Sequence, residues 1–158
     1  MPQPQSLNRP CFPCSSTSRH RGSAYAREST IAEKLHAMVE LGLGNSRMKD
    51  YYDLWFLSTE YPFVGNLLAN AVRATFDRRE TALPHEVPAG LSDHFATDAA
   101  KVAQWVAFLR RARLRKEAPP LDLLVVSLRG FLMPVVNAAG AASAIDTVWR
   151  PGGPWEVR

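Results

Sequence analysis

The apolar residues of this chain repeat every three or four positions, and this spacing limits the possible folds more than any other feature. Between Leu121 and Leu132 they recur along one face of an α-helix. Similar stripes recur from Tyr25 onward, whereas the alternation typical of a half-buried strand is not convincing anywhere. The sequence therefore predicts an all-α fold of about five packed helices in a single domain.

The expected helices differ in how clearly their ends are marked. Pro134 should end or kink the last one, or begin a short successor helix. The buried side of the fourth should be formed by Val102, Trp105, Val106, Leu109 and Ala112. A Pro-containing loop over residues 80–96 precedes that helix. The predicted helices span residues 28–43, 46–58, 65–79 and about 98–116, with the last beginning at Leu121.

The composition divides the chain into three parts. Residues 1–24 are rich in Pro, Ser and Arg without periodicity, which predicts a disordered leader. Residues 25–138 form the helical domain. Residues 139–158 form a turn-rich tail that Trp149 and Trp155 could pin to the rest.

The charge and the cysteine content of the chain exclude few classes of function. The net charge of +4 is compatible with a polyanionic partner without identifying one. Cys11 and Cys14 form the only cysteine pair, too few ligands for a typical zinc site. The sequence shows no apolar run of transmembrane length and no signal peptide, so we expect a cytoplasmic protein without a membrane partner.

The first helix carries a lysine at the edge of its apolar stripe. Ile31, Leu35 and Met38 form the stripe, and Lys34 lies about 60° from Ile31 around the helix. Two interpretations are open. The lysine either lays its stem along the core and reaches solvent with its ammonium group, or it serves a binding site.

The second helix carries two aspartates among cations. Asp50 and Asp53 are three residues apart, on the face opposite the apolar residues of this helix. Arg47 neighbours Asp50, and Lys49 neighbours Asp53. This is either a solvated, salt-bridged face or a site in which a carboxylate acts on a substrate while the cations hold phosphate. Because the turn before this helix is short, Lys34 and both aspartates should meet in one cleft.

These two helices contain the patterns Glu-Ser-x-x-Ala-Glu-Lys-x-x-Ala-Met and Asn-Ser-Arg-x-Lys-Asp-x-x-Asp-Leu. They resemble the third and fourth motifs of the nucleotidyltransferase toxins of the AbiEii/AbiGii family, which belong to bacterial type IV toxin–antitoxin and phage-abortive systems. The matching residues are Glu28, Ser29, Ala32, Glu33, Lys34, Ala37, Met38, Asn45, Ser46, Arg47, Lys49, Asp50, Asp53 and Leu54. The tail also resembles the end of many family members, which extends the resemblance over most of residues 25–158.

The resemblance implies roles for the matching residues. Lys34 would contact the phosphates of a nucleoside triphosphate (NTP), supported by Arg47 and Lys49. Either Asp50 or Asp53 would be the catalytic aspartate. The family also implies Mg²⁺, an RNA acceptor such as tRNA, and a cognate antitoxin that acts without a stable complex.

One family motif is missing. The family's metal-binding carboxylates form an Asp-x-Asp/Glu pair after a Gly-Ser turn, but here Gly22-Ser23 is followed by no such pair. We therefore expect no metal ligands in this chain. The chain would then correspond to the helical C-terminal part of such a toxin, and it would be inactive alone. The alternatives are a non-catalytic module that binds nucleic acid or protein, and a decayed gene product.

A second cluster of cations lies at the end of the fourth predicted helix. It is denser than is needed to complement the helix dipole, so phosphate binding competes with simple solvation as its explanation. The candidate nucleic-acid-binding residues are Arg110, Arg111, Arg113 and Arg115.

Overall fold

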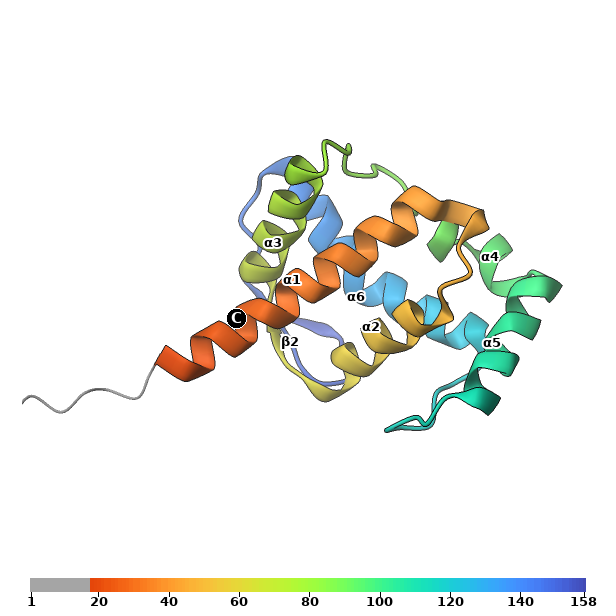
Figure 1. The fold of residues 1–158 in the computed structure, drawn as a ribbon. Helices are drawn as coiled ribbons and strands as arrows, with labels where there is room; N and C mark the ends of the chain where they lie inside the picture. The colour runs from red at the N-terminus through yellow and green to blue at the C-terminus, as the bar shows by residue number, and fades with distance from the viewer. Residues whose placement is uncertain (1–17) are drawn as a thin grey trace, which may run out of the picture.

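The computed structural model describes residues 18–158, with side chains from residue 25 onward. This part of the chain forms six α-helices and one small antiparallel sheet (Figure 1), which confirms the all-α prediction in the main. The helices are α1 (Ser18–Leu41), α2 (Met48–Glu60), α3 (Gly65–Arg78), α4 (Asp93–Thr97), α5 (Ala99–Arg111) and α6 (Leu121–Ala141). Two 3-10 turns, η1 (Gly42–Gly44) and η2 (Ala89–Leu91), lie in the connections.

The core lies where α1, α3 and α6 pack in succession, with α2 also against α6. Figure 1 shows α1 as a long orange helix across the front and α6 in blue behind it. Ile31, Leu35 and Met38 of α1 are fully buried, as the apolar stripe predicted. Leu124 and Leu128 of α6 are equally buried, so the most periodic helix in the sequence is also the centre of the core.

Helix α6 differs from its prediction in two ways. It continues through Pro134 to Ala141, so the helix neither ends at Pro134 nor gives way there to a separate one. It is also long and apolar enough to cross a membrane by length and composition alone, although half of its most apolar window is buried inside this fold. The sequence shows no uninterrupted run of that length because Asp122 and Arg129 break it. The burial of α6 against its neighbours is what a core helix requires.

The C-terminal tail contributes strands that the sequence did not predict. Strand β1 (Phe63–Val64) pairs with β2 (Thr147–Trp149), and β2 pairs with β3 (Trp155–Val157), all antiparallel. Such short strands are too brief to show a period of two. Trp149 Nε1 donates to the carbonyl of Ser58 at 2.7 Å, so this tryptophan does pin the tail. Trp155 Nε1 likewise donates to the carbonyl of Phe131 at 2.9 Å.

Two helix boundaries need correction. Helix α1 begins at Ser18, inside the segment expected to be disordered, while residues 1–17 of that prediction lie outside the described residues. Helix α5 ends at Arg111, five residues before its predicted end, and Trp105 is its one fully buried residue. Val102 and Val106, expected on its buried side, are 39% and 38% exposed because α5 packs along one edge, against α2 and α4.

The loop between α3 and α4 is anchored to the helices at Gly90. Tyr51 of α2 donates its hydroxyl proton to the Gly90 carbonyl at 2.7 Å, and both residues are buried. A Cβ atom at Gly90 would lie 2.9 Å from the Met38 carbonyl oxygen and 3.1 Å from the Tyr51 hydroxyl. The close approach of α1, α2 and η2 therefore needs glycine at this position.

We expect Gly90→Ala to lower the free energy of unfolding by about 1–3 kcal/mol, because the added methyl group overpacks this contact. Gly130→Ala is the control, since a Cβ there meets nothing within 4 Å on an exposed face of α6. It should raise the free energy of unfolding by about 0.5–1 kcal/mol through helix propensity. Urea unfolding of both variants measures this, and equal effects would contradict the role of Gly90.

Candidate functional site: an ion-pair cluster between α1 and α2

The turn between α1 and α2 fixes where the second helix begins. Asn45 is fully buried, and its side-chain oxygen accepts a hydrogen bond from the Arg47 backbone N–H at 2.9 Å. Lys101 of α5 donates to the Asn45 carbonyl at 2.9 Å. Arg47 occupies the N-cap position of α2 without a side-chain cap, although Asn45 and Ser46 are of the residue types that favour such a position. The buried asparagine instead ties the turn to α5.

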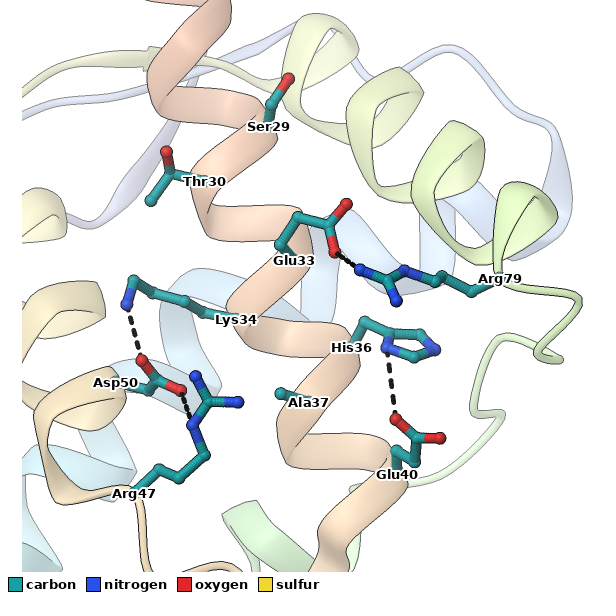
Figure 2. Close-up of a pocket in the computed structure, with 10 residues that line it drawn as sticks. All are labelled: Ser29, Thr30, Glu33, Lys34, His36, Ala37, Glu40, Arg47, Asp50 and Arg79. Atoms are coloured by element: carbon teal, nitrogen blue, oxygen red, sulfur yellow. Dashed lines mark hydrogen bonds and ion pairs between the residues drawn. The ribbon is translucent and has the colours of Figure 1, made fainter.

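Lys34 of α1 lies between the two aspartates of α2. Its Nζ is 2.6 Å from Asp50 Oδ1 and 3.0 Å from Asp53 Oδ2. The predicted convergence of these three side chains is therefore confirmed. Figure 2 shows the lysine reaching from α1 towards Asp50. The short turn makes the contact possible, because it leaves α1 and α2 as neighbours.

Asp50 is buried rather than exposed, which corrects the prediction that it lies on a polar face. Its side chain is 6% exposed because α1 covers this side of α2. Its position in the first turn of α2 lets the positive end of the helix dipole stabilise the carboxylate. Arg47 Nε lies 2.9 Å from Asp50 Oδ2, yet within the described structure that oxygen accepts no well-aligned hydrogen bond. Asp50 therefore keeps one acceptor with unused capacity.

Asp53 occupies the more open end of the cluster. Its side chain is 24% exposed and is shared between Lys34 and Lys49, whose Nζ lies 2.6 Å from Oδ2. Lys49 itself is 74% exposed. Three cations thus surround two carboxylates, and the cluster of Lys34, Arg47, Lys49, Asp50 and Asp53 carries a formal charge of +1 (3 − 2).

The lysine at the centre of the cluster has a shifted pKa. Burial by itself would lower the pKa of Lys34, but hydrogen bonds and attraction from Asp50 and Asp53 outweigh burial and raise the pKa above 10.5. The ammonium group is therefore held in its charged form at neutral pH, which is the form that binds an anion.

A pocket of about 530 Å³ opens over α1 beside this cluster. In Figure 2, Lys34, Asp50 and Arg47 lie on one side of α1, and Glu33 with Arg79 on the other. Burial would raise the pKa of Glu33, but hydrogen bonds from Arg79 and Arg78 lower it, so this pair is charged at neutral pH. The pocket is lined by Ser29, Thr30, Glu33, Lys34, His36, Ala37, Glu40, Arg47, Asp50 and Arg79.

The far wall of this pocket was not predicted from the sequence. His36 is buried with Nε2 2.9 Å from the Thr81 hydroxyl, and its Nδ1 lies 3.8 Å from Glu40. The only signal in the sequence is that His36 and Glu40 are four residues apart on one helix. Arg79 reaches the pocket from the end of α3, a contact that helical periodicity cannot reveal.

Comparison with known proteins identifies the family of this chain. The family model described as "Nucleotidyl transferase AbiEii toxin, Type IV TA system" matches residues 21–126 of the 158. The chain belongs to the AbiEii family. No curated protein and no solved structure matches. The match ends within α6, so it does not include the tail, over which the sequence resemblance was expected to extend.

The AbiEii family implies a divalent metal, and the described residues do not fit one. Within residues 25–158 no group of three or more His, Cys, Asp or Glu side chains could hold a metal ion. Asp50 and Asp53 are the two carboxylates of the cluster. Three cations already pair with them, and their positive charge opposes the binding of a metal cation.

The arginines at the end of α5 do not line the pocket over α1. Arg110 and Arg111 close α5, while Arg113 and Arg115 lie in the segment that follows, not on the helix as predicted. All four are exposed and make no ion pair with any residue that the structure describes.

We expect Lys34→Ala to lower the free energy of unfolding at pH 7 by about 3 kcal/mol, because it leaves the buried Asp50 carboxylate with only the exposed Arg47 as a cation. Lys49→Ala removes an equally short but exposed contact and should cost less than about 0.5 kcal/mol. Since the pKa of Lys34 is raised on folding, its stabilising effect is complete below pH 10.5 and disappears as the pH rises through the folded value.

Urea unfolding of the two variants tests this difference. The double variant Lys34→Ala/Asp50→Asn should recover part of the stability that Lys34→Ala loses, because the uncompensated charge is gone. Equal losses for Lys34→Ala and Lys49→Ala would show that burial of the Asp50 pair has no energetic consequence.

Proposed function

We propose that this AbiEii-family protein binds the polyphosphate of an NTP at the ion-pair cluster and contributes to nucleotide transfer to an RNA acceptor. The observation that supports this most is the position of the Lys34 ammonium group. It lies at the edge of the pocket over α1, held by two carboxylates and flanked by Arg47. Such an arrangement offers an incoming phosphate a charged donor that is already oriented.

Phosphate binding would exchange partners within the cluster. The Lys34 side chain is 18% exposed, so its ammonium group is accessible from the pocket without unfolding either helix. Arg47 is 59% exposed, and its guanidinium group has donors to spare beyond the one near Asp50. A phosphate that takes over these donors would be bound by two cations, with Lys49 adding positive charge from the rim.

Of the two aspartates, we propose Asp50 as the catalytic one. Its Oδ1 is held by Lys34, while Oδ2 has capacity to accept a hydrogen bond and the residue lines the pocket. Oδ2 is buried and lies 2.9 Å from Arg47 Nε, so a hydroxyl of the RNA acceptor would reach it once the phosphate has drawn the Arg47 guanidinium group away, and would then pass its proton to this carboxylate. Asp53, bound to Lys34 and Lys49, would serve as a positioning residue that holds the lysine in place.

The remaining family properties also belong to this proposal. Because the described residues do not fit Mg²⁺, we propose that the metal ligands used by the family come from a segment other than the α1–α2 cluster. We further propose that the protein acts in the cytoplasm and is opposed by an antitoxin that does not form a stable complex with it.

The binding step can be tested without metal. Calorimetric titration with each of the four NTPs in EDTA should show binding of at least one. Arg47→Ala should weaken this binding roughly tenfold, the effect of losing one charge-assisted hydrogen bond. Lys34→Ala should weaken it further. Arg150→Ala, on the β2–β3 hairpin, is the matched control and should bind as the wild type does. Unchanged binding by both cluster variants would refute the phosphate site.

We expect the isolated chain not to transfer nucleotides, because the cluster offers no metal site to complete the chemistry. The assay incubates the protein with each labelled NTP, Mg²⁺ or Mn²⁺, and total tRNA. Transfer that appears only when a polypeptide carrying the Asp-x-Asp/Glu motif is added would support the proposal. Robust transfer by the chain alone that is abolished by Lys34→Ala would contradict this expectation.

A further inference from the structure

A second concave surface shares Arg47 and Asp50 with the pocket over α1. Two adjoining pockets of about 700 and 490 Å³ lie between α2 and the end of α5. They share Lys49, Phe108 and Ala112, so they form one continuous depression, here called the α2–α5 groove. Its charged lining residues are Arg47, Lys49, Asp50, Asp53, Arg111, Arg113 and Arg115, and its lining also includes Phe56 and Phe108.

Three cations of this groove have no partner within the described part of the chain. Arg111, Arg113 and Arg115 are exposed and form neither an ion pair nor a side-chain hydrogen bond with any part of the chain that is described. Several other surface cations, by contrast, are paired with carboxylates: Arg78 and Arg79 with Glu33, Lys116 with Glu60, Arg129 with Asp93 and Arg150 with Glu156. Among the described residues, the only carboxylates that line the groove are those of Asp50 and Asp53, and both are already paired. The groove thus has excess positive charge along its length.

Aromatic rings lie among these cations. Phe108 lines both pockets and stacks on the buried Trp105, with ring centroids 5.6 Å apart and planes at 30°. Trp105 is itself fixed by a hydrogen bond from Nε1 to the Pro119 carbonyl at 3.1 Å. Phe56, half-buried, lines the outer pocket. Phe108 therefore presents a supported ring that is only partly covered, with arginines around it.

This combination favours a flexible polyanion with planar groups. Unpaired arginines attract phosphates, and a ring fixed from behind offers a stacking surface for a base, which is how single strands are bound without sequence readout. An acidic peptide would satisfy the charge but would have no use for the ring. Arg110, although equally unpaired within the described residues, does not line the groove, so we leave it out of the site.

We propose that the α2–α5 groove binds single-stranded nucleic acid, with phosphates on Arg111, Arg113 and Arg115 and a base on Phe108. Arg47 and Asp50 line both this groove and the pocket over α1. A strand in the groove would thus bring its end close to the Asp50 carboxylate, which also lines the pocket proposed for the NTP. Its identity as the acceptor strand rests on the proposed function, whereas its binding does not.

The test measures fluorescence anisotropy of a labelled twelve-nucleotide uridine RNA at several KCl concentrations, without NTP. The wild type should bind with an affinity that falls as salt rises. Arg111→Ala/Arg113→Ala should reduce the slope of log affinity against log salt by roughly 0.7 for each phosphate that is no longer neutralised. Phe108→Leu, which keeps apolar packing but removes the stacking face, should weaken binding about tenfold with little change in slope. Arg150→Ala is the control for surface charge and should behave as the wild type.

Three results would overturn the proposal. They are no binding by the wild type, an unchanged salt slope in the double arginine variant, and displacement of the RNA by polyglutamate of equal charge as effectively as by unlabelled RNA. A parallel ATP titration separates this outcome from the proposed function. If Lys34→Ala and Arg47→Ala leave ATP binding unchanged while Arg111→Ala/Arg113→Ala weakens RNA binding, the result supports the groove and refutes the NTP site. The reverse pattern refutes the groove alone.

Discussion

The arrangement of the whole site depends on one buried ion pair, between Lys34 of α1 and Asp50 of α2. A carboxylate that is almost completely buried is costly unless it is paired, and here Lys34, Arg47 and the first turn of α2 all compensate its charge. The pair also fixes the two helices side by side at the point where the pocket over α1 and the α2–α5 groove meet. Any change that separates Lys34 from Asp50 therefore affects stability and the proposed chemistry together.

Family membership and local geometry support one another in this protein, although neither is sufficient alone. The family model places the chain among AbiEii nucleotidyl transferase toxins but assigns no role to any residue. The structure brings Lys34, Asp50 and Asp53 within ion-pair distance, but a salt-bridged helix face would show the same distances. The distinguishing features are the burial of Asp50, the unused capacity of its Oδ2, and its place in the walls of two depressions.

Much of this site was predictable from the sequence, and the parts that were not have a common cause. A short turn between two amphipathic helices is enough to bring Lys34 to the aspartates. Helical periodicity, however, describes one helix at a time, so it placed Asp50 on an exposed face that α1 in fact covers. For the same reason, periodicity predicted that Val102 and Val106 of α5 are buried, whereas both are partly exposed in the fold. The unpaired state of Arg111 and Arg113 within the described residues also depends on what lies opposite them in space.

The most direct test of this account is nuclear magnetic resonance of the lysine side-chain ammonium groups. With Lys34 held by two carboxylates in a partly buried site, its NH₃⁺ protons should exchange slowly enough with water to give a signal near pH 7. The signal of the exposed Lys49 should be broadened or absent. Asp50→Asn should shift or remove the Lys34 signal, and addition of an NTP in EDTA should shift it in the wild-type protein. A Lys34 signal that exchanges as fast as that of Lys49, or that is unchanged by Asp50→Asn, would contradict the ion pair on which the account is built.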